Sequence, residues 1–235
     1  MTEERHRIAA NIADVRQRIA AAAGKSGREP EDVRLVAVSK WVEEERVALA
    51  VGQWIVDFGE NYIQELIKKA NLFPQNRWHM IGQIQKNKVK YMPGVVQLIH
   101  SLDSWGTAEE IDRRFAQAGQ AACVLVQVNI GRESQKAGLP PEEVPGFCER
   151  LRSMAWIRLQ GLMAIPPAGS PEETRPFFAR MRELFERIQS QTGPLDWLSM
   201  GMSADYEAAI EEGANMVRVG SSIFGNRPSK DNSSR

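Results

Sequence analysis

The first part of the chain carries apolar residues at helical spacing. Four of them recur three or four positions apart, which places them on one face of a helix: Ile8, Ile12, Val15 and Ile19. Gly24 follows this stripe, and glycine is a frequent stop signal for a helix. The pattern predicts a helix over residues 4–23 that buries one face against the rest of the protein.

From residue 34 onwards, short apolar runs rich in β-branched residues alternate with amphipathic stretches. Such runs favour buried strands, and strands that alternate with helices favour parallel pairing. About eight runs can be distinguished, over residues 34–40, 54–59, 78–82, 97–103, 124–130, 159–164, 197–202 and 216–224. The pattern predicts an α/β fold, a modified (β/α)8 TIM barrel with an extra N-terminal helix. A doubly wound open sheet is the competing architecture.

The length of the chain fits one domain of this kind. It has 235 residues, and a (β/α)8 barrel typically needs about 250. We expect a single barrel domain over residues 1–226 and a polar, disordered tail over residues 227–235. Two capping boxes mark helix starts between the predicted strands: Thr107 with Glu110, and Ser170 with Glu173.

Composition and charge narrow the classes of partner. The chain has 30 basic and 30 acidic residues, and this zero net charge argues against nucleic acid or a membrane surface as the main partner. No apolar run approaches the roughly 20 residues of a spanning helix, and the charged N-terminus is unlike a signal peptide. Cys123 and Cys148 form no framework and are interpreted as small core hydrophobes. We therefore expect a cytoplasmic protein.

Lys40 stands at the end of the first predicted strand. Alternation along a strand puts Val36, Val38 and Lys40 on one face, so Lys40 lies at the barrel mouth if the valines point inwards. Desolvation lowers the pKa of a lysine from about 10.4 and frees the amine to attack a carbonyl group. A lysine that faces solvent is the plain alternative.

Two turns rich in glycine and serine follow the last two predicted strands. Residues 201–203 form the first, and Ser203 is a candidate N-cap because a helical pattern follows at once. The second begins with Gly220 and Ser221. Helix N-termini and hydroxyl groups bind anions, and barrels often hold phosphate in the loops after strands seven and eight. Together the turns predict a phosphate cradle.

Two further polar residues lie near these turns. Arg218 shares a strand face with Gly220 and would lie deeper, beneath the ring of a bound cofactor. Beside a pyridine nitrogen it would donate a hydrogen bond and keep that nitrogen unprotonated, which makes the ring a poorer electron sink. An ion pair between strand and helix explains Arg218 equally well. Asn61 could bind a cofactor oxygen or cap the following helix, and spacing alone slightly favours the cap.

The remaining candidates have simpler interpretations. His79 and His100 lie in predicted strands, where a histidine is more often a hydrogen-bonded core residue than a catalyst. Gln127 and Asn129 share one face of the fifth strand, which fits polar lining near a ligand. Lys136 is interpreted as solvated.

With these residues assembled, the chain resembles the pyridoxal phosphate homeostasis proteins, a barrel family related to the N-terminal domain of alanine racemase. Several of the shared stretches are long and unusual in composition. They span nearly the whole chain in the family order: LVAVSK at 35–40, FGENYIQE at 58–65, HMIGQIQKNK at 79–88, VNIGRESQKAG at 128–138, GLMAIPP at 161–167, LSMGMSADYEAAI at 198–210 and MVRVGSSIFG at 216–225.

The resemblance implies pyridoxal 5′-phosphate (PLP) as the cofactor, held as a Schiff base on Lys40. It implies a non-catalytic protein of vitamin B6 homeostasis that buffers PLP or delivers it to apoenzymes, with effects on amino and keto acid balance. Trp41 departs from the family, which more often has a smaller or polar residue after the lysine. The other implied cofactor-binding residues are the phosphate ligands Ser203, Gly220 and Ser221 with backbone help from Met202, Arg218 at the ring nitrogen, and Asn61.

Two alternatives stay open from the sequence. One is a weak PLP-dependent racemase or related enzyme, and the other is a cofactor-free aldolase that uses Lys40 on a phosphorylated sugar. Because the chain ends just after the eighth strand, we expect the second domain of the racemases to be absent. One dimer surface is then absent too, so we expect a monomer.

Overall fold

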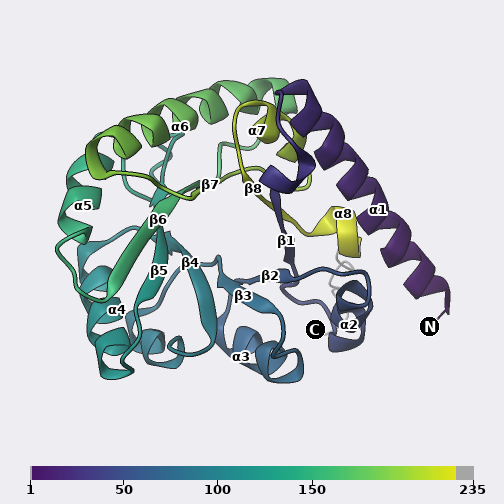
Figure 1. The fold of residues 1–235 in the computed structure, drawn as a ribbon, viewed down its shortest axis with the longest axis horizontal. Coiled ribbons are helices and arrows are strands. Elements are labelled where there is room, and N and C mark those ends of the chain that lie inside the picture. The colour runs from purple at the N-terminus through teal and green to yellow at the C-terminus, as the bar shows by residue number, and fades with distance from the viewer. Residues whose placement is uncertain (1, 226–235) are drawn as a thin grey trace, which may run out of the picture.

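A closed barrel of eight parallel strands lies at the centre of the protein (Figure 1). The computed structural model describes residues 2–225, so the tail expected over residues 227–235 lies outside the described part. Each strand pairs with its neighbours in sequence, and the last pairs with the first, which confirms the barrel and excludes the open sheet. The strands are β1 (Arg34–Val38), β2 (Asp57–Glu60), β3 (Arg77–Met80), β4 (Val96–Leu102), β5 (Ala122–Val128), β6 (Ile157–Ala164), β7 (Trp197–Ser199) and β8 (Met216–Val219).

Several strands end before the predicted apolar run does. β1 ends two residues before Lys40, and β8 ends at Val219 although its run was expected to continue to residue 224. The run continues because the turn after β8 is buried as well: Ile223 and Phe224 lie in one helical turn, α8 (Ser221–Phe224). Lys40 and the glycine/serine turns therefore lie in loops at the carboxyl ends of the strands.

Helices form an outer layer around the barrel (Figure 1). No helix in the described range is long and apolar enough to cross a membrane. A 3₁₀ helix, η2, stands between β3 and β4 in place of an α-helix, and a short one, η1, precedes β1. The elements of this layer are α2 (Glu44–Val51), α3 (Ile63–Leu72), α4 (Trp105–Gln117), α5 (Val144–Leu151), α6 (Pro171–Thr192), α7 (Tyr206–Glu211), η1 (Pro30–Asp32) and η2 (Lys86–Tyr91).

The N-terminal helix α1 (Thr2–Lys25) packs beside α2, α7 and α8, and so covers the part of the barrel that the short α8 leaves open (Figure 1). Its predicted apolar stripe is buried. The helix continues through Gly24, which was expected to end it, because the chain first turns left-handed at Gly27 (φ +69°). The Asn11 amide donates to the Ile223 carbonyl at 2.9 Å. Helix α1 therefore contacts α8, which directly follows β8.

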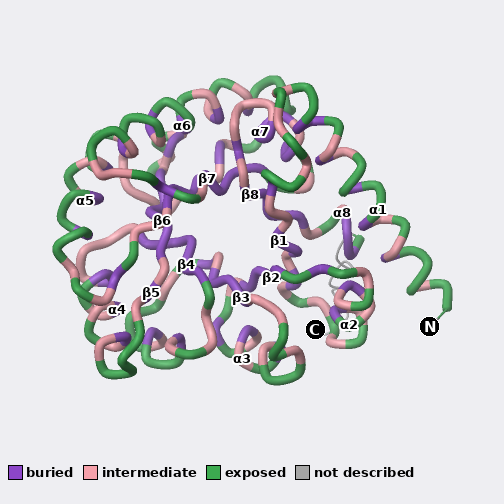
Figure 2. The backbone as a smooth tube through the Cα atoms, in the orientation of Figure 1, coloured by how far each residue is buried: buried purple, intermediate pink, exposed green. Residues whose placement is uncertain are grey.

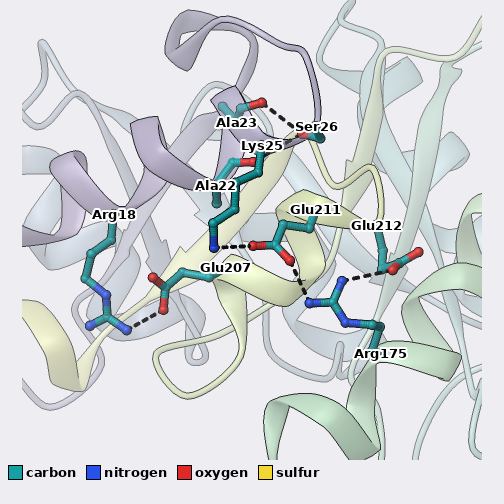
Figure 3. A network of polar contacts seen from close by, with 9 residues as sticks. All are labelled: Arg18, Ala22, Ala23, Lys25, Ser26, Arg175, Glu207, Glu211 and Glu212. Carbon is teal, nitrogen blue, oxygen red and sulfur yellow. Dashed lines mark hydrogen bonds and ion pairs between the residues drawn. The ribbon is translucent and has the colours of Figure 1, made fainter.

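Ion pairs join α1, α7 and α6 on the surface (Figure 3). Arg18 pairs with Glu207 at 2.5 Å, Lys25 pairs with Glu211 at 3.0 Å, and Arg175 also contacts Glu211 at 2.6 Å. These side chains are partly exposed, and exposed pairs contribute at most about 1 kcal/mol each. The buried stripe of α1 therefore stabilises its packing more than the network does.

The core has two parts. A large outer part lies between the strands and the helices, and the buried strands are visible as the purple ring in Figure 2. A small inner part fills the barrel with alternate residues of the strands: Val36, Leu98, Leu125, Met163 and Met216. Val36 therefore points into the barrel while Ala37 belongs to the outer core, which meets the condition under which Lys40 was expected at the barrel mouth.

One of the two predicted capping boxes is present. The Ser170 hydroxyl accepts from the Glu173 N–H and the Glu173 carboxylate accepts from the Ser170 N–H, at the start of α6. The prediction of a capping box at Thr107 is wrong, because α4 begins earlier, at Trp105, with Ser104 as its N-cap residue. Thr107 lies in the first turn instead, where its hydroxyl accepts from the Ser104 hydroxyl at 2.8 Å.

Candidate functional site

The barrel brings the sequence-predicted site residues to four consecutive strands. Lys40 follows β1, Asn61 follows β2, Ser203 lies after β7 and Gly220 follows β8, and the strand order β7, β8, β1, β2 is continuous around the barrel. All four lie at the carboxyl ends of their strands, where barrels of this type carry their functional sites. The predicted residues therefore form one candidate site.

Lys40 is half-buried in the turn after β1. Its ammonium lies 5.8 Å from the centre of the Trp41 ring. Trp41 has φ +59°, in the left-handed region that non-glycine residues rarely adopt, and its side chain is 52% exposed. The backbone thus makes a strained turn at the residue after the candidate lysine, and strain of this kind is common at functional sites.

A buried polar cluster lies outside the barrel wall behind Lys40. The Lys69 ammonium on α3 donates to the Ser39 carbonyl and to the Glu60 carboxylate, both at 2.7 Å. The Ser39 hydroxyl donates to the same carboxylate oxygen at 2.7 Å. Burial raises the pKa of the Glu60 carboxyl, and the Lys69 ammonium and the Ser39 hydroxyl offset part of this effect. The cluster ties together the residues that directly precede Lys40 and Asn61.

The glycine/serine turns meet at one hydroxyl group. The backbone N–H groups of Gly220 and Ser222 both donate to the Ser203 Oγ, at 3.1 and 3.3 Å. Two donors that converge on one oxygen form a cradle of the kind that holds a phosphate oxygen. A Cβ on Gly220 would lie 3.2 Å from the Val38 carbonyl oxygen, so this turn packs closely against β1. The geometry therefore fits an anion site.

Ser203 is not the N-cap that the sequence predicted. Residues 202–205 form a turn in which the Asp205 carboxylate accepts from the Met202 N–H at 2.7 Å, and α7 begins only at Tyr206. The Ser203 side chain reaches across to the Gly220 turn instead of capping its own helix. The N–H of Met202, which was expected to help with phosphate, already has an acceptor in this conformation. Ser221, in contrast, is exposed at the start of α8.

Arg218 lies inside the barrel and is 3% exposed. Its guanidinium donates to the Ser199 Oγ at 2.6 Å and to the Ala164 carbonyl at 3.0 Å. Burial lowers its pKa to about 10, with the Asp205 charge opposing the change, so the group is cationic at neutral pH. Within residues 2–225, no carboxylate forms an ion pair with it, which disfavours the alternative of a strand-to-helix salt bridge. A buried cation that only donates fits an acceptor such as an unprotonated pyridine nitrogen.

Asn61 does not cap α3. The helix begins at Ile63 after Tyr62, and no side chain forms its cap. Asn61 instead lines a pocket of about 270 Å³ whose other polar lining residues include Gln83, Gln85 and Lys88. This pocket lies at the carboxyl ends of β2 and β3, and its lining does not include Lys40, Ser203, Arg218 or Gly220, so the role of Asn61 at the cofactor stays a prediction.

The structure also shows the surroundings of the histidines, Asn129 and Lys136. His79 and His100 are buried and hydrogen-bonded to each other, as expected of core histidines. Asn129 hydrogen-bonds to the backbone of Glu133 and thereby shapes the loop after β5. The interpretation of Lys136 as solvated is wrong, because its half-buried ammonium donates to the Pro166 carbonyl at 2.9 Å.

Sequence reasoning missed the cluster behind Lys40. One signal was available: Lys69 falls on the buried face of its helix with Ile63 and Leu66, three residues apart in each case. A lysine on an apolar face is rarely buried without a partner. Glu60, which directly precedes Asn61, supplies that partner.

Known proteins resemble the chain over almost its whole length. A sequence profile of the alanine racemase N-terminal domain matches residues 5–228. The chain is 43% identical over 224 residues to the pyridoxal phosphate homeostasis protein of Pseudomonas aeruginosa, which covers 94% of this chain and 96% of that protein.

Two solved structures share the fold at 32% identity. One is an unknown protein from Bifidobacterium adolescentis, with a TM-score of 0.89 over 95% of this chain and 97% of that one. The other is PipY of Synechococcus elongatus with PLP bound, with a TM-score of 0.80 over 93% of this chain and 100% of that one.

Proposed function

Because the chain belongs to the alanine racemase N-terminal domain family, and within it to the pyridoxal phosphate homeostasis proteins, we propose that it binds PLP and serves vitamin B6 homeostasis. One observation carries the proposal: a two-donor anion cradle, a half-buried lysine and a buried arginine lie on adjacent strands at one end of the barrel. PLP has a phosphate, an aldehyde and a pyridine nitrogen, and each of these has a matching group here. PipY, a relative of the same fold, was solved with PLP bound.

We assign each part of the cofactor to residues of this chain. The amine of Lys40 forms the Schiff base. The N–H groups of Gly220 and Ser222, with the hydroxyls of Ser203 and Ser221, hold the phosphate. For this, Ser203 has to yield the two N–H groups that its oxygen now accepts. A backbone donor from Met202 joins only if Asp205 releases it.

Arg218 and Asn61 complete the assignment. The guanidinium of Arg218 donates to the ring nitrogen, and Asn61 lies beside the cofactor. Bound PLP supplies an electrophilic carbon and an electron-accepting ring. A cationic donor at the ring nitrogen opposes its protonation and weakens the ring as an electron sink. This arrangement favours holding the cofactor over turning over amino acids.

We propose that the protein is non-catalytic, acts as a monomer in the cytoplasm, and buffers PLP or passes it to apoenzymes. The names of the relatives support homeostasis as the broad role. A half-exposed turn at Lys40 supports exchange, because the amine stays within reach of an incoming group.

An absorption spectrum of the purified protein tests the proposal. We expect a visible band for the parent with PLP, its loss on borohydride treatment, and a reduced adduct on the peptide that contains Lys40. Lys40→Ala should lack the band, whereas Lys136→Ala, a lysine from the loop after β5, should keep it. A parent that stays colourless with added PLP would refute the proposal and favour the cofactor-free aldolase. Exchange of the α-proton of alanine above the rate with free PLP would favour the racemase.

A further inference from the structure

A chain of buried polar side chains crosses the interior of the barrel. The Asp57 Oδ1 lies 3.0 Å from the His79 Nε2, and the His79 Nδ1 lies 2.9 Å from the His100 Nε2. The His100 Nδ1 lies 3.1 Å from the Ser199 Oγ, which accepts from Arg218 at 2.6 Å. The five residues come from β2, β3, β4, β7 and β8, and none is more than 8% exposed.

When both histidines are neutral, the chemistry of the two ends sets the direction of every hydrogen bond. A carboxylate only accepts, so the His79 Nε2–H donates to Asp57 and the His79 Nδ1 is an acceptor. The His100 Nε2–H must then donate to His79, which leaves the His100 Nδ1 as an acceptor.

The other end closes the chain. The Ser199 hydroxyl donates its only proton to the His100 Nδ1, and its lone pairs face Arg218, which only donates. Each link has one donor and one acceptor when both histidines are neutral. A further proton on either ring would reverse or break a link.

The charges around the chain support neutral histidines. Arg77 contacts Asp57 at 2.8 Å and Arg34 lies 4.0 Å from it, so the carboxylate already has cationic partners. Arg218 stands at the opposite end, next to Ser199. A histidinium would thus add a positive charge between the buried Arg218 and the partly exposed Arg34 and Arg77. Burial lowers the pKa of His79 and lowers that of His100 well below the usual value.

We propose that Asp57, His79, His100 and Ser199 form a one-directional hydrogen-bond chain that positions Arg218 for the ring nitrogen of PLP. This inference rests on the proposed function and assigns to these four residues a positioning role. Because the Ser199 hydroxyl donates its proton to His100, its oxygen acts only as an acceptor towards Arg218. The guanidinium is thereby anchored through one nitrogen, with the Ala164 carbonyl anchoring the other.

The first test needs no PLP and leaves the residues of the chain itself unchanged. The chain has three histidines, so the long-range ¹H–¹⁵N spectrum of their rings is simple, and His6→Gln removes the signals of the one on α1. We expect His79 and His100 both to be neutral with the proton on Nε2 at pH 7. A proton on Nδ1 of either ring, or a protonated ring, would overturn the proposed direction of the chain.

The second test measures the effect on the cofactor. Ser199→Ala removes the acceptor of Arg218 with little change of volume, and Ser199→Thr keeps it. The matched control is Ser101→Ala, which removes a buried hydroxyl from β4 that donates to the Gly82 carbonyl instead. We expect Ser199→Ala to hold PLP about tenfold more weakly, since one charge-assisted hydrogen bond is lost. The pH profile of its visible band should also shift, while Ser199→Thr and Ser101→Ala keep the parent's profile.

The outcomes distinguish a failure of PLP binding from a failure of the positioning role. A parent that binds no PLP refutes the proposed function, and the ring spectrum still decides the direction of the chain. If the parent binds PLP and Ser199→Ala matches Ser101→Ala in both affinity and pH profile, the positioning role is refuted. Circular dichroism of each variant shows whether a loss of PLP reflects unfolding, and a folded Ser199→Ala with the expected shift supports the proposal.

Discussion

Lys69 offers a strong test of how the region behind Lys40 is held together. Lys69→Met keeps an unbranched side chain of similar length and removes the charge. The Glu60 carboxylate then retains the Ser39 hydroxyl as a donor but loses its counter-charge. The second oxygen of Glu60 already lacks a hydrogen-bond partner in the described part of the chain. The substitution therefore leaves a buried charge without compensation.

The expected loss of stability is large. Glu60 is fully buried and the Lys69 side chain is 4% exposed. Removing one partner of a buried pair costs about 3–5 kcal/mol. In a protein of this size each kcal/mol lowers the melting temperature by about 2–4 °C, so we expect a fall of roughly 6–20 °C.

The loss should also depend on pH. Burial raises the pKa of Glu60 in the folded parent, and the variant lacks the ammonium that partly offsets this effect. The folded state of the variant thus binds a proton more tightly than the unfolded chain does. Protonation removes the uncompensated charge, so the deficit should shrink at acid pH and grow as pH rises through the folded pKa.

Chemical unfolding at pH 5 and pH 8 measures this difference. Lys68→Met is a matched control from the next position, because Lys68 pairs with Glu44 at 2.7 Å while 68% exposed. It should lose little stability at either pH, because an exposed ion pair is screened by solvent. Adding Glu60→Gln to Lys69→Met should recover part of the stability. Equal losses for the two lysine variants, or a Lys69→Met deficit that does not change with pH, would refute the reasoning.

Two further predictions concern the turns and the barrel interior. Gly201→Ala should loosen α7 and lower the melting temperature, because Gly201 has φ +90° and a Cβ there would lie 2.6 Å from the Ala209 Cβ. Gly24→Ala should leave the melting temperature unchanged, because a Cβ there would meet nothing within 4 Å. Equal melting curves for the two variants would contradict this prediction. Burial lowers the pKa of His79 and His100 in the folded protein. Below about pH 6.5 these two histidines therefore bind protons in the unfolded chain but not in the folded one. Stability should therefore fall from pH 7 to pH 5, with an uptake of up to two protons in calorimetric unfolding, and no uptake would show that the rings are already charged.

Local patterns were sufficient for the architecture. The alternation of apolar runs with amphipathic stretches predicted the barrel, because a parallel strand is buried on both faces and leaves a compact hydrophobic signal. Period-two alternation put Val36 on the same strand face as Lys40, and the structure shows that Val36 points inwards. Lys40, Ser203, Gly220 and Arg218 were all selected from their positions at strand ends, and the barrel places them on neighbouring strands.

Local patterns failed where the partner of a group is distant in sequence. Ser203 precedes a helical pattern, which suggested a cap, but its hydroxyl accepts from residues of another turn. Lys69 reaches Ser39 across 30 positions, and Ser199 lies 99 positions from His100.

The sequence by itself determined the alternation of strands and helices and the polar residues that follow each strand, since these follow from periodicities of two and 3.6 residues. The closure of the sheet, with β8 paired to β1, was decided by the structure. The tertiary structure alone decided which polar groups are buried and with what partners. Burial of Glu60, His100 and Arg218 depends on the closure of the barrel and on helix packing. Their charges and hydrogen-bond directions follow from that closure, because desolvation acts on a group only once its surroundings exclude water.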